Sequence, residues 1–161
     1  MIQYIDFKEN SLTGFIPTQI GKLTSLQLLS LTGNELSGSI PTQIGNLISL
    51  NTMFLQLNQL VGSIPSQIGN LKNLSSIYLS VNQLDGILPS QIGNLILLQQ
   101  LVISSNNLSG SIPQQIGNLK ILTHFDLSDN SMTGRLPSDI ISLTSLTYCD
   151  LSKNGFEGEL P

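Results

Sequence analysis

Four residues near the C-terminus have types and spacing that could support metal binding or acid–base chemistry. His124 and Asp126 lie two residues apart, and Tyr148 and Asp150 repeat that spacing 24 residues later. Histidine and carboxylate side chains are common metal ligands and proton-transfer groups. Two or three such groups on a flat sheet leave no cavity that excludes water, so we interpret all four as exposed polar residues available to a partner.

No other constellation is typical of an enzyme. The sequence contains no glycine-rich phosphate loop, no cysteine or histidine cluster and no nucleophile elbow. The single cysteine, Cys149, falls in a column of apolar residues, so we expect a small buried thiol that is unreactive and forms no disulfide within the chain. We therefore expect no catalytic activity and no cofactor.

The elements that position these residues follow from an internal repeat. The seven prolines all lie 24 residues apart, and each marks a repeat boundary: Pro17, Pro41, Pro65, Pro89, Pro113, Pro137 and Pro161. Composition bias does not produce such a register. We predict a single domain over residues 1–161, built from about seven copies of one unit.

Each unit repeats the same columns of residues. Apolar side chains recur as at Leu47, Leu50, Met53 and Leu55, and the L-x-L alternation predicts a short strand with one buried face. One asparagine per unit predicts a buried, hydrogen-bonded ladder. The residues after each proline, such as Thr-Gln-Ile-Gly-Asn, predict a short helical turn that the Ser or Thr caps. The asparagine column is Asn10, Asn34, Asn58, Asn82, Asn106, Asn130 and Asn154.

The pattern resembles the plant-type leucine-rich repeat, whose marker L-x-G-x-I/L-P appears at Leu36–Pro41 and its equivalents. The resemblance covers Ile2 to Pro161. It implies an α/β solenoid: a right-handed superhelix with a parallel sheet on the concave side, a second short sheet and helical turns on the convex side. It also implies a non-catalytic module that binds a protein or peptide on its concave face. A fragment of a receptor-like ectodomain is the form we favour, at the cell surface or outside the cell.

Variation between units locates the expected binding surface. In one outward column the family most often has aspartate, as at Asp126 and Asp150, but three successive units carry Phe54, Tyr78 and Val102 instead. Together with Leu28 in the neighbouring column, these side chains are expected to form an exposed apolar patch. The alternative is cross-strand packing that only stabilises the sheet. The predicted binding residues are Leu28, Phe54, Tyr78 and Val102, flanked by His124, Asp126, Tyr148 and Asp150.

Composition excludes some partners and leaves other functions open. The net charge of −4 and the scattered Lys and Arg residues argue against nucleic acid, and no apolar run is long enough to span a membrane. A secreted inhibitor of the polygalacturonase-inhibiting type remains an alternative. An ice-binding or purely structural array is another, because hydroxyl residues follow most of the prolines, as at Thr18, Thr42 and Ser66.

The ends of the array and two sequons lead to further expectations. The cysteine-paired caps that are usual in secreted members of the family are missing, and the first unit should present an open apolar end formed by Ile2, Ile5, Phe7, Leu12 and Ile16. We therefore expect further repeats in a longer protein, with end-to-end self-association as an alternative. Asn73 and Asn107 begin N-x-S sequons on outward positions and are possible glycosylation sites.

Overall fold

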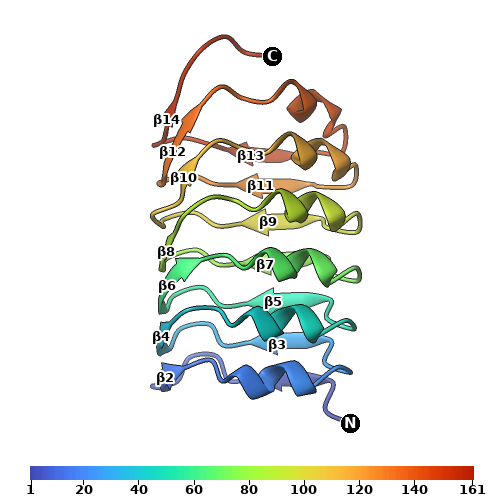
Figure 1. Ribbon diagram of the computed structural model, residues 1–161, viewed down its shortest axis with the longest axis vertical. Helices are drawn as coiled ribbons and strands as arrows, with labels where there is room; N and C mark the ends of the chain where they lie inside the picture. Colours follow the sequence, from blue (N-terminus) through green and yellow to red (C-terminus); the bar gives the residue numbers. More distant parts are fainter.

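The computed structural model describes residues 1–161 as a stack of coils with the two termini at opposite ends (Figure 1). Each coil contributes one strand to a long parallel sheet, and six of them also contribute a short 3-10 helix. This arrangement confirms the predicted α/β solenoid. None of the helices is long and apolar enough to cross a bilayer.

The concave sheet has seven parallel strands in the order β1-β3-β5-β7-β9-β11-β13. Residues 24 apart in sequence pair across neighbouring strands, as Met53 pairs with Ile77. The middle residue of each inner strand points into the stack and is fully buried. The strands are β1 (Tyr4–Asp6), β3 (Leu28–Ser30), β5 (Thr52–Phe54), β7 (Ser76–Tyr78), β9 (Gln100–Val102), β11 (His124–Asp126) and β13 (Tyr148–Asp150).

The second short sheet that the resemblance implied is present in two parts. The first part has four strands: β2 (Thr13–Phe15), β4 (Glu35–Gly38), β6 (Gln59–Ser63) and β8 (Gln83–Asp85). The second part has three: β10 (Ser109–Gly110), β12 (Ser131–Gly134) and β14 (Gly155–Phe156). A single bridge between Ile87 and Ser109 lies where the two parts meet.

The six helices stack in a column along one side of the solenoid (Figure 1). They are η1 (Thr18–Lys22), η2 (Thr42–Asn46), η3 (Ser66–Asn70), η4 (Ser90–Asn94), η5 (Gln114–Asn118) and η6 (Ser138–Ser142). The expectation that Ser or Thr caps them is wrong. The capping position is the proline, which supplies the extended backbone needed there (φ −68°, ψ 142° at Pro41), and no side chain caps the helix. The Thr42 hydroxyl instead donates to the Gln43 side chain at 3.4 Å.

The interior consists of one apolar cluster of 35 buried residues that runs the length of the stack. A hydrogen-bonded asparagine ladder accompanies it, as predicted, but only Asn34 and Asn106 of the column are buried. Asn58 accepts a hydrogen bond from the Leu36 amide at 3.1 Å and donates to the carbonyls of Leu31 (2.9 Å) and Leu55 (3.1 Å). Leu36 and Leu31 belong to the preceding coil, so Asn58 joins two coils while satisfying backbone groups of both. The ladder residues from Asn34 to Asn154 make equivalent bonds, whereas Asn10 bonds only within its own coil.

The first coil is open, as expected from the missing cap. An apolar hollow of about 230 Å³ lies there and is lined by Ile5, Phe7, Leu12 and Ile16 among others. Ile16 itself is buried, whereas Phe7 and Ile2 are exposed.

The last coil corrects the prediction for Cys149, which is exposed rather than buried. Its equivalent one coil earlier, Phe125, is fully buried because β13 covers it, whereas no strand covers β13. Partial desolvation and the carboxylates of Asp150 and Asp126 raise the pKa of the Cys149 thiol, so it stays protonated at neutral pH.

Candidate concave binding site

Three apolar side chains lie side by side on the concave sheet. The strand register places Phe54 on β5 beside Tyr78 on β7, and Tyr78 beside Val102 on β9. The Phe54 and Tyr78 rings have centroids 5.2 Å apart and are tilted by 52°, a favourable aromatic geometry. All three side chains are half-buried, because neighbouring residues of this outward column pack against one another. They therefore form one contiguous surface.

Leu28 lies one column away from these three. It pairs with Thr52, whereas the residue of β3 opposite Phe54 is Ser30. Leu28 is nevertheless close to Phe54, because both line the same hollow of the concave face. The four predicted apolar residues are thus on one face, with Leu28 joined to the others diagonally through Phe54.

Hydrogen bonds fix the aromatic pair on the sheet. The Tyr78 hydroxyl donates to the Gln100 side-chain oxygen at 2.9 Å, and the Ser76 hydroxyl donates to the same oxygen at 3.2 Å. Gln100 comes from β9, so the Tyr78 ring is held between two strands. Sequence reasoning did not select Gln100, because an outward glutamine in a variable column carries no distinctive signal.

The polar flank continues from Val102 toward the last coil. Val102 pairs with Asp126, and Asp126 pairs with Asp150. His124 stacks on Tyr148 with ring centroids 5.8 Å apart. The Asp126 carboxylate accepts hydrogen bonds from the Ser128 amide at 2.9 Å and the Ser128 hydroxyl at 2.7 Å.

The charges of this flank are set by local hydrogen bonds and carboxylates. The hydroxyl and amide of Ser152 lower the pKa of Asp150. Desolvation, together with the carboxylates of Asp126 and Asp150, raises the pKa of the Tyr148 phenol. The flank is therefore negative at neutral pH. No group of three or more His, Cys, Asp or Glu side chains is arranged to hold a metal ion.

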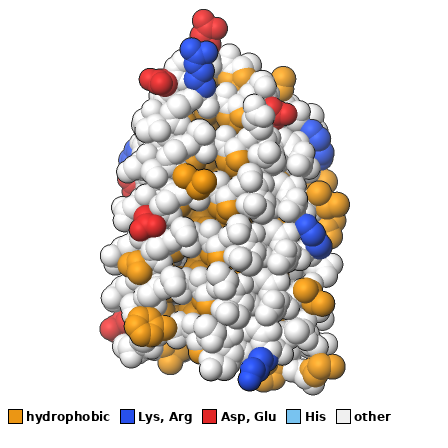
Figure 2. Space-filling model, in the orientation of Figure 1, with side chains coloured by type: hydrophobic (Ala, Val, Ile, Leu, Met, Phe, Trp, Pro, Cys, Tyr) orange, Lys and Arg blue, Asp and Glu red, His pale blue; other side chains and the backbone are white.

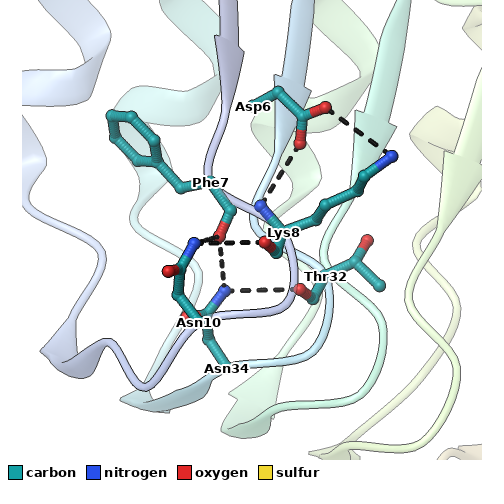
Figure 3. Close-up of polar contacts among 6 residues, drawn as sticks. All are labelled: Asp6, Phe7, Lys8, Asn10, Thr32 and Asn34. Atoms are coloured by element: carbon teal, nitrogen blue, oxygen red, sulfur yellow. Dashed lines mark hydrogen bonds and ion pairs between the residues drawn. The ribbon is translucent and has the colours of Figure 1, made fainter.

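A hollow of about 360 Å³ lies at the other end of the apolar surface. Its lining includes Leu28 and Phe54 and also Asp6 and Lys8. Figure 3 shows the polar contacts between Asp6 and Lys8. Asp6 accepts a hydrogen bond from the Lys8 amide at 3.2 Å, and its other oxygen lies 3.9 Å from the Lys8 ammonium. The Ser30 hydroxyl and then the Lys8 amide lower the pKa of Asp6. The full lining is Asp6, Lys8, Leu28, Ser30, Thr32, Phe54 and Gln56.

The turn after each concave strand carries a feature that the sequence analysis missed. The residue before each ladder asparagine has a positive φ, and at Gly33 this needs no explanation. Leu57 (φ 59°) and Val81 (φ 57°) occupy the same left-handed position and remain about half exposed. Left-handed backbone is unfavourable for a β-branched residue. Two adjacent coils thus carry strained, exposed apolar residues beside Phe54 and Tyr78.

Comparison with known proteins identifies the family. Leucine-rich repeat models match residues 96–156 and, in a second form, residues 1–23, 25–47 and 73–95. The chain belongs to the leucine-rich repeat family. A search of curated protein sequences found no match.

Solved leucine-rich repeat structures resemble the whole chain. A TDR receptor is 39% identical with a TM-score of 0.97, and the match covers 99% of this chain and 28% of the receptor chain. The Arabidopsis receptor kinase HAESA, solved with the peptide hormone IDA and the co-receptor SERK1, is 36% identical with a TM-score of 0.96 (99% and 27% covered). A plant ice-binding protein is 30% identical with a TM-score of 0.72 (96% and 57% covered). The chain therefore spans little more than a quarter of the two receptor chains.

The leucine-rich repeat array has other hollows and patches outside the concave face. A larger groove of about 640 Å³ lies between the second sheet and the helices, and no charged residue lines it. Its walls include Thr42, Ser66 and Ser90 from the ladder that follows the prolines. Figure 2, which views the molecule as in Figure 1, shows a face made mainly of backbone and uncharged side chains, with scattered hydrophobic and charged groups.

An apolar patch on the loops after the helices was also missed from the sequence. Ile96, Leu97 and Ile121 are exposed at neighbouring loop positions of consecutive coils. Lys72 and Lys120 occupy the Ile96 position in the coils on either side, and their ammonium groups donate to backbone carbonyls. Because this loop position occurs once in every coil, the patch can be recognised from the sequence only by comparing the residues that different repeats carry there.

Both predicted sequon asparagines are exposed. The Asn73 side-chain amide donates to the Ile48 carbonyl at 2.9 Å, whereas the Asn107 side chain makes no hydrogen bond within the chain. Asn107 is therefore the less constrained of the two.

Proposed function

We propose that this leucine-rich repeat array is a non-catalytic module that binds a protein or peptide on its concave face, as part of a receptor-like ectodomain at the cell surface. The observation that carries the proposal is the contiguous group Phe54, Tyr78 and Val102. Their column holds aspartate in the coils at both ends, at Asp6, Asp126 and Asp150. These half-buried side chains form a partly exposed aromatic group with polar borders, and such groups are typical of binding hot spots.

The solved relatives support this proposal. HAESA was solved with a peptide hormone and a co-receptor, and the match with HAESA covers 99% of this chain. A rigid sheet needs little rearrangement on binding, which lowers the entropic cost of association. The polar flank of His124, Asp126, Tyr148 and Asp150 gives the surface a negative border, which suits a partner with basic residues beside an apolar segment.

The test is quantitative capture of partners from plant extracellular fluid by the immobilised array. The double variant Phe54→Ser, Tyr78→Ser should lose at least about 90% of the captured partner, since aromatic hot spots each contribute about 2 kcal/mol or more. The matched control Ile96→Ser, Ile121→Ser removes exposed apolar side chains from the loops instead. Equal capture by the wild type and the concave variant contradicts the proposal. A captured hydrolase that loses activity when the array is added would assign the inhibitor type.

The apolar hollow of the first coil is the surface on which further repeats or a second copy would stack. Its lining repeats the residue columns that seal every internal coil interface, and β1 has a free edge. Light scattering on the isolated array tests the second copy: a concentration-dependent dimer supports it, and a monomer at all concentrations contradicts it.

Ice binding is a second candidate, and one specific observation favours it. The uncharged groove beside the helices is lined by hydroxyl and amide side chains repeated from coil to coil, and a plant ice-binding protein shares the fold. Ice recrystallisation inhibition that is lost in the variant Thr42→Lys, Ser66→Lys and retained in Phe54→Ser, Tyr78→Ser would support it. No inhibition by the wild type would dismiss it.

A further inference from the structure

The hollow at the start of the concave face contains one carboxylate, from Asp6. Ser30 and Thr32 add hydroxyls and Gln56 adds a side-chain amide, groups that can both donate and accept hydrogen bonds. Lys8 is the only cation in the lining, and its ammonium is beside Asp6 (Figure 3). A separation of 3.9 Å between two exposed groups is a loose ion pair, so the Asp6 carboxylate retains capacity for another donor.

Gln56 provides an independent observation: its side-chain oxygen lacks a hydrogen-bond donor. Its side-chain oxygen is out of reach of solvent and has no hydrogen-bond partner, and it is the one buried side-chain polar atom in the protein of which this is true. Buried acceptors are almost always paired, because leaving one unpaired is unfavourable. Rotation of the terminal amide into the hollow would let this oxygen accept a bond from a ligand.

Phe54 gives the hollow an aromatic wall. The half-buried ring lines the hollow together with Leu28, and its other neighbour is Tyr78. A planar cation can lie against an aromatic face while its edge donates hydrogen bonds. The hollow of about 360 Å³ therefore combines an aromatic wall and a carboxylate, and rotation of the Gln56 amide would turn its unpaired oxygen toward them.

We infer that this hollow binds an arginine side chain of the partner, with the guanidinium against Phe54 and donating to Asp6 and Gln56. The inference rests on the proposed function, because it assigns the chemistry of one contact on the same face. Arginine fits better than lysine, since a guanidinium presents five donors in a plane and stacks on aromatic rings, whereas an ammonium is compact and strongly hydrated. An acidic side chain would meet Asp6 and leave Gln56 unpaired.

The test uses a small probe, N-acetyl-L-arginine methylamide, titrated into the isotope-labelled array and followed by the NMR signals of the Ser30 and Thr32 backbone amides, which every variant retains. We expect a saturable shift with a millimolar Kd. The citrulline analogue, which has the same shape without the charge, should bind about tenfold more weakly. Asp6→Asn and Gln56→Leu should each weaken arginine binding about tenfold, and Lys8→Gln should strengthen it by freeing Asp6.

The matched control is Asp85→Asn, which removes the same charge from the second sheet and should leave the affinity unchanged. The inference is overturned by the absence of a saturable shift, by equal affinity for citrulline, by an equal effect of Asp85→Asn and Asp6→Asn, or by tighter binding of N-acetyl-L-glutamate methylamide. The amide spectrum reports folding of each variant directly. Failure here leaves the proposed function intact, because that proposal is judged by partner capture with the Phe54 and Tyr78 variant.

Discussion

At the scale of single residues, the turn after each concave strand contains backbone strain that side-chain packing does not offset. Leu57 and Val81 adopt a left-handed backbone, yet each side chain is about half exposed, so neither recovers the strain through burial. Strained residues that packing does not explain tend to occur at functional sites. Every coil has a positive φ at this position, however, so the strain at Leu57 and Val81 follows from the turn that leads to the ladder asparagine and not from the candidate site.

The strain at Val81 can be measured directly. Val81→Asn should stabilise the array by about 1 kcal/mol, because asparagine tolerates the left-handed region that valine does not. The expected result is a higher urea midpoint at an unchanged slope. The control Val61→Asn replaces an exposed valine whose φ is not positive and should give no gain. A lower midpoint for Val81→Asn would show that the valine side chain stabilises the turn.

The asparagine ladder leads to a second prediction at this scale. Asn58→Ala should lower the free energy of unfolding by about 2–4 kcal/mol, because it removes partners from the Leu36 amide and the Leu31 and Leu55 carbonyls. Asn107→Ala is the matched control, since that exposed side chain makes no hydrogen bond, and its effect should stay within about 0.5 kcal/mol. Equal effects in urea unfolding would mean that the ladder contributes little.

At the scale of elements, glycine sets how closely the helices stack. A Cβ added at Gly45 on η2 would lie 2.6 Å from the Gln67 carbonyl oxygen on η3, and the other glycines of this column are equally confined. The column changes to Ile141 on η6, which has no helix above it and is 69% exposed. The requirement for glycine in this column is therefore imposed by the neighbouring coil and not by the helix itself.

Gly45→Ala should consequently destabilise the array by about 1–3 kcal/mol through overpacking against η3. Ile141→Ala, at the equivalent position without a neighbour, should change the midpoint of thermal unfolding by no more than about 2 °C. Comparison of the two variants tests whether contact with the neighbouring coil causes the destabilisation. A neutral Gly45→Ala would show that the stack relaxes without cost.

Most of the elements could be predicted from the sequence, because the 24-residue period fixes strand, asparagine and helix positions together. The apolar hollow of the first coil also followed, since Ile5 and Phe7 fall in the apolar columns of the repeat. The exposure of Cys149 could not be predicted from its column, because burial there depends on the next strand and not on the residue. The capping prediction failed because proline already supplies the geometry that a capping residue usually provides.

The arrangement of the candidate site residues could be predicted only where the 24-residue period was informative. The alignment of Phe54, Tyr78 and Val102 follows from the register, but their half-buried packing and the Gln100 hydrogen bonds depend on rotamers that no pattern fixes. The unpaired Gln56 oxygen is likewise a property of the assembled hollow. The left-handed backbone at Val81 was missed because Leu57 and Val81 are residue types that give no signal of a positive φ.

At the scale of the whole molecule, the array presents three chemically different sides. The concave sheet carries the aromatic group with a carboxylate at each end, the helical side carries an uncharged groove, and the loops between them carry an apolar patch with lysines on both sides. Rigidity is common to all three, because every coil is held to its neighbours by the apolar cluster and the asparagine ladder. Recognition therefore depends on which side a partner meets.

The most direct test of the concave assignment is site-specific photo-cross-linking. A benzoylphenylalanine is placed at Thr52, between Leu28 and Ser76 on the concave sheet, or at Gln67 in the helical groove, and each protein is irradiated with the captured partner. We predict cross-links from position 52 that disappear in the Phe54→Ser, Tyr78→Ser background, and none from position 67. Cross-links from position 67 alone would place the partner on the opposite side and contradict the proposed function.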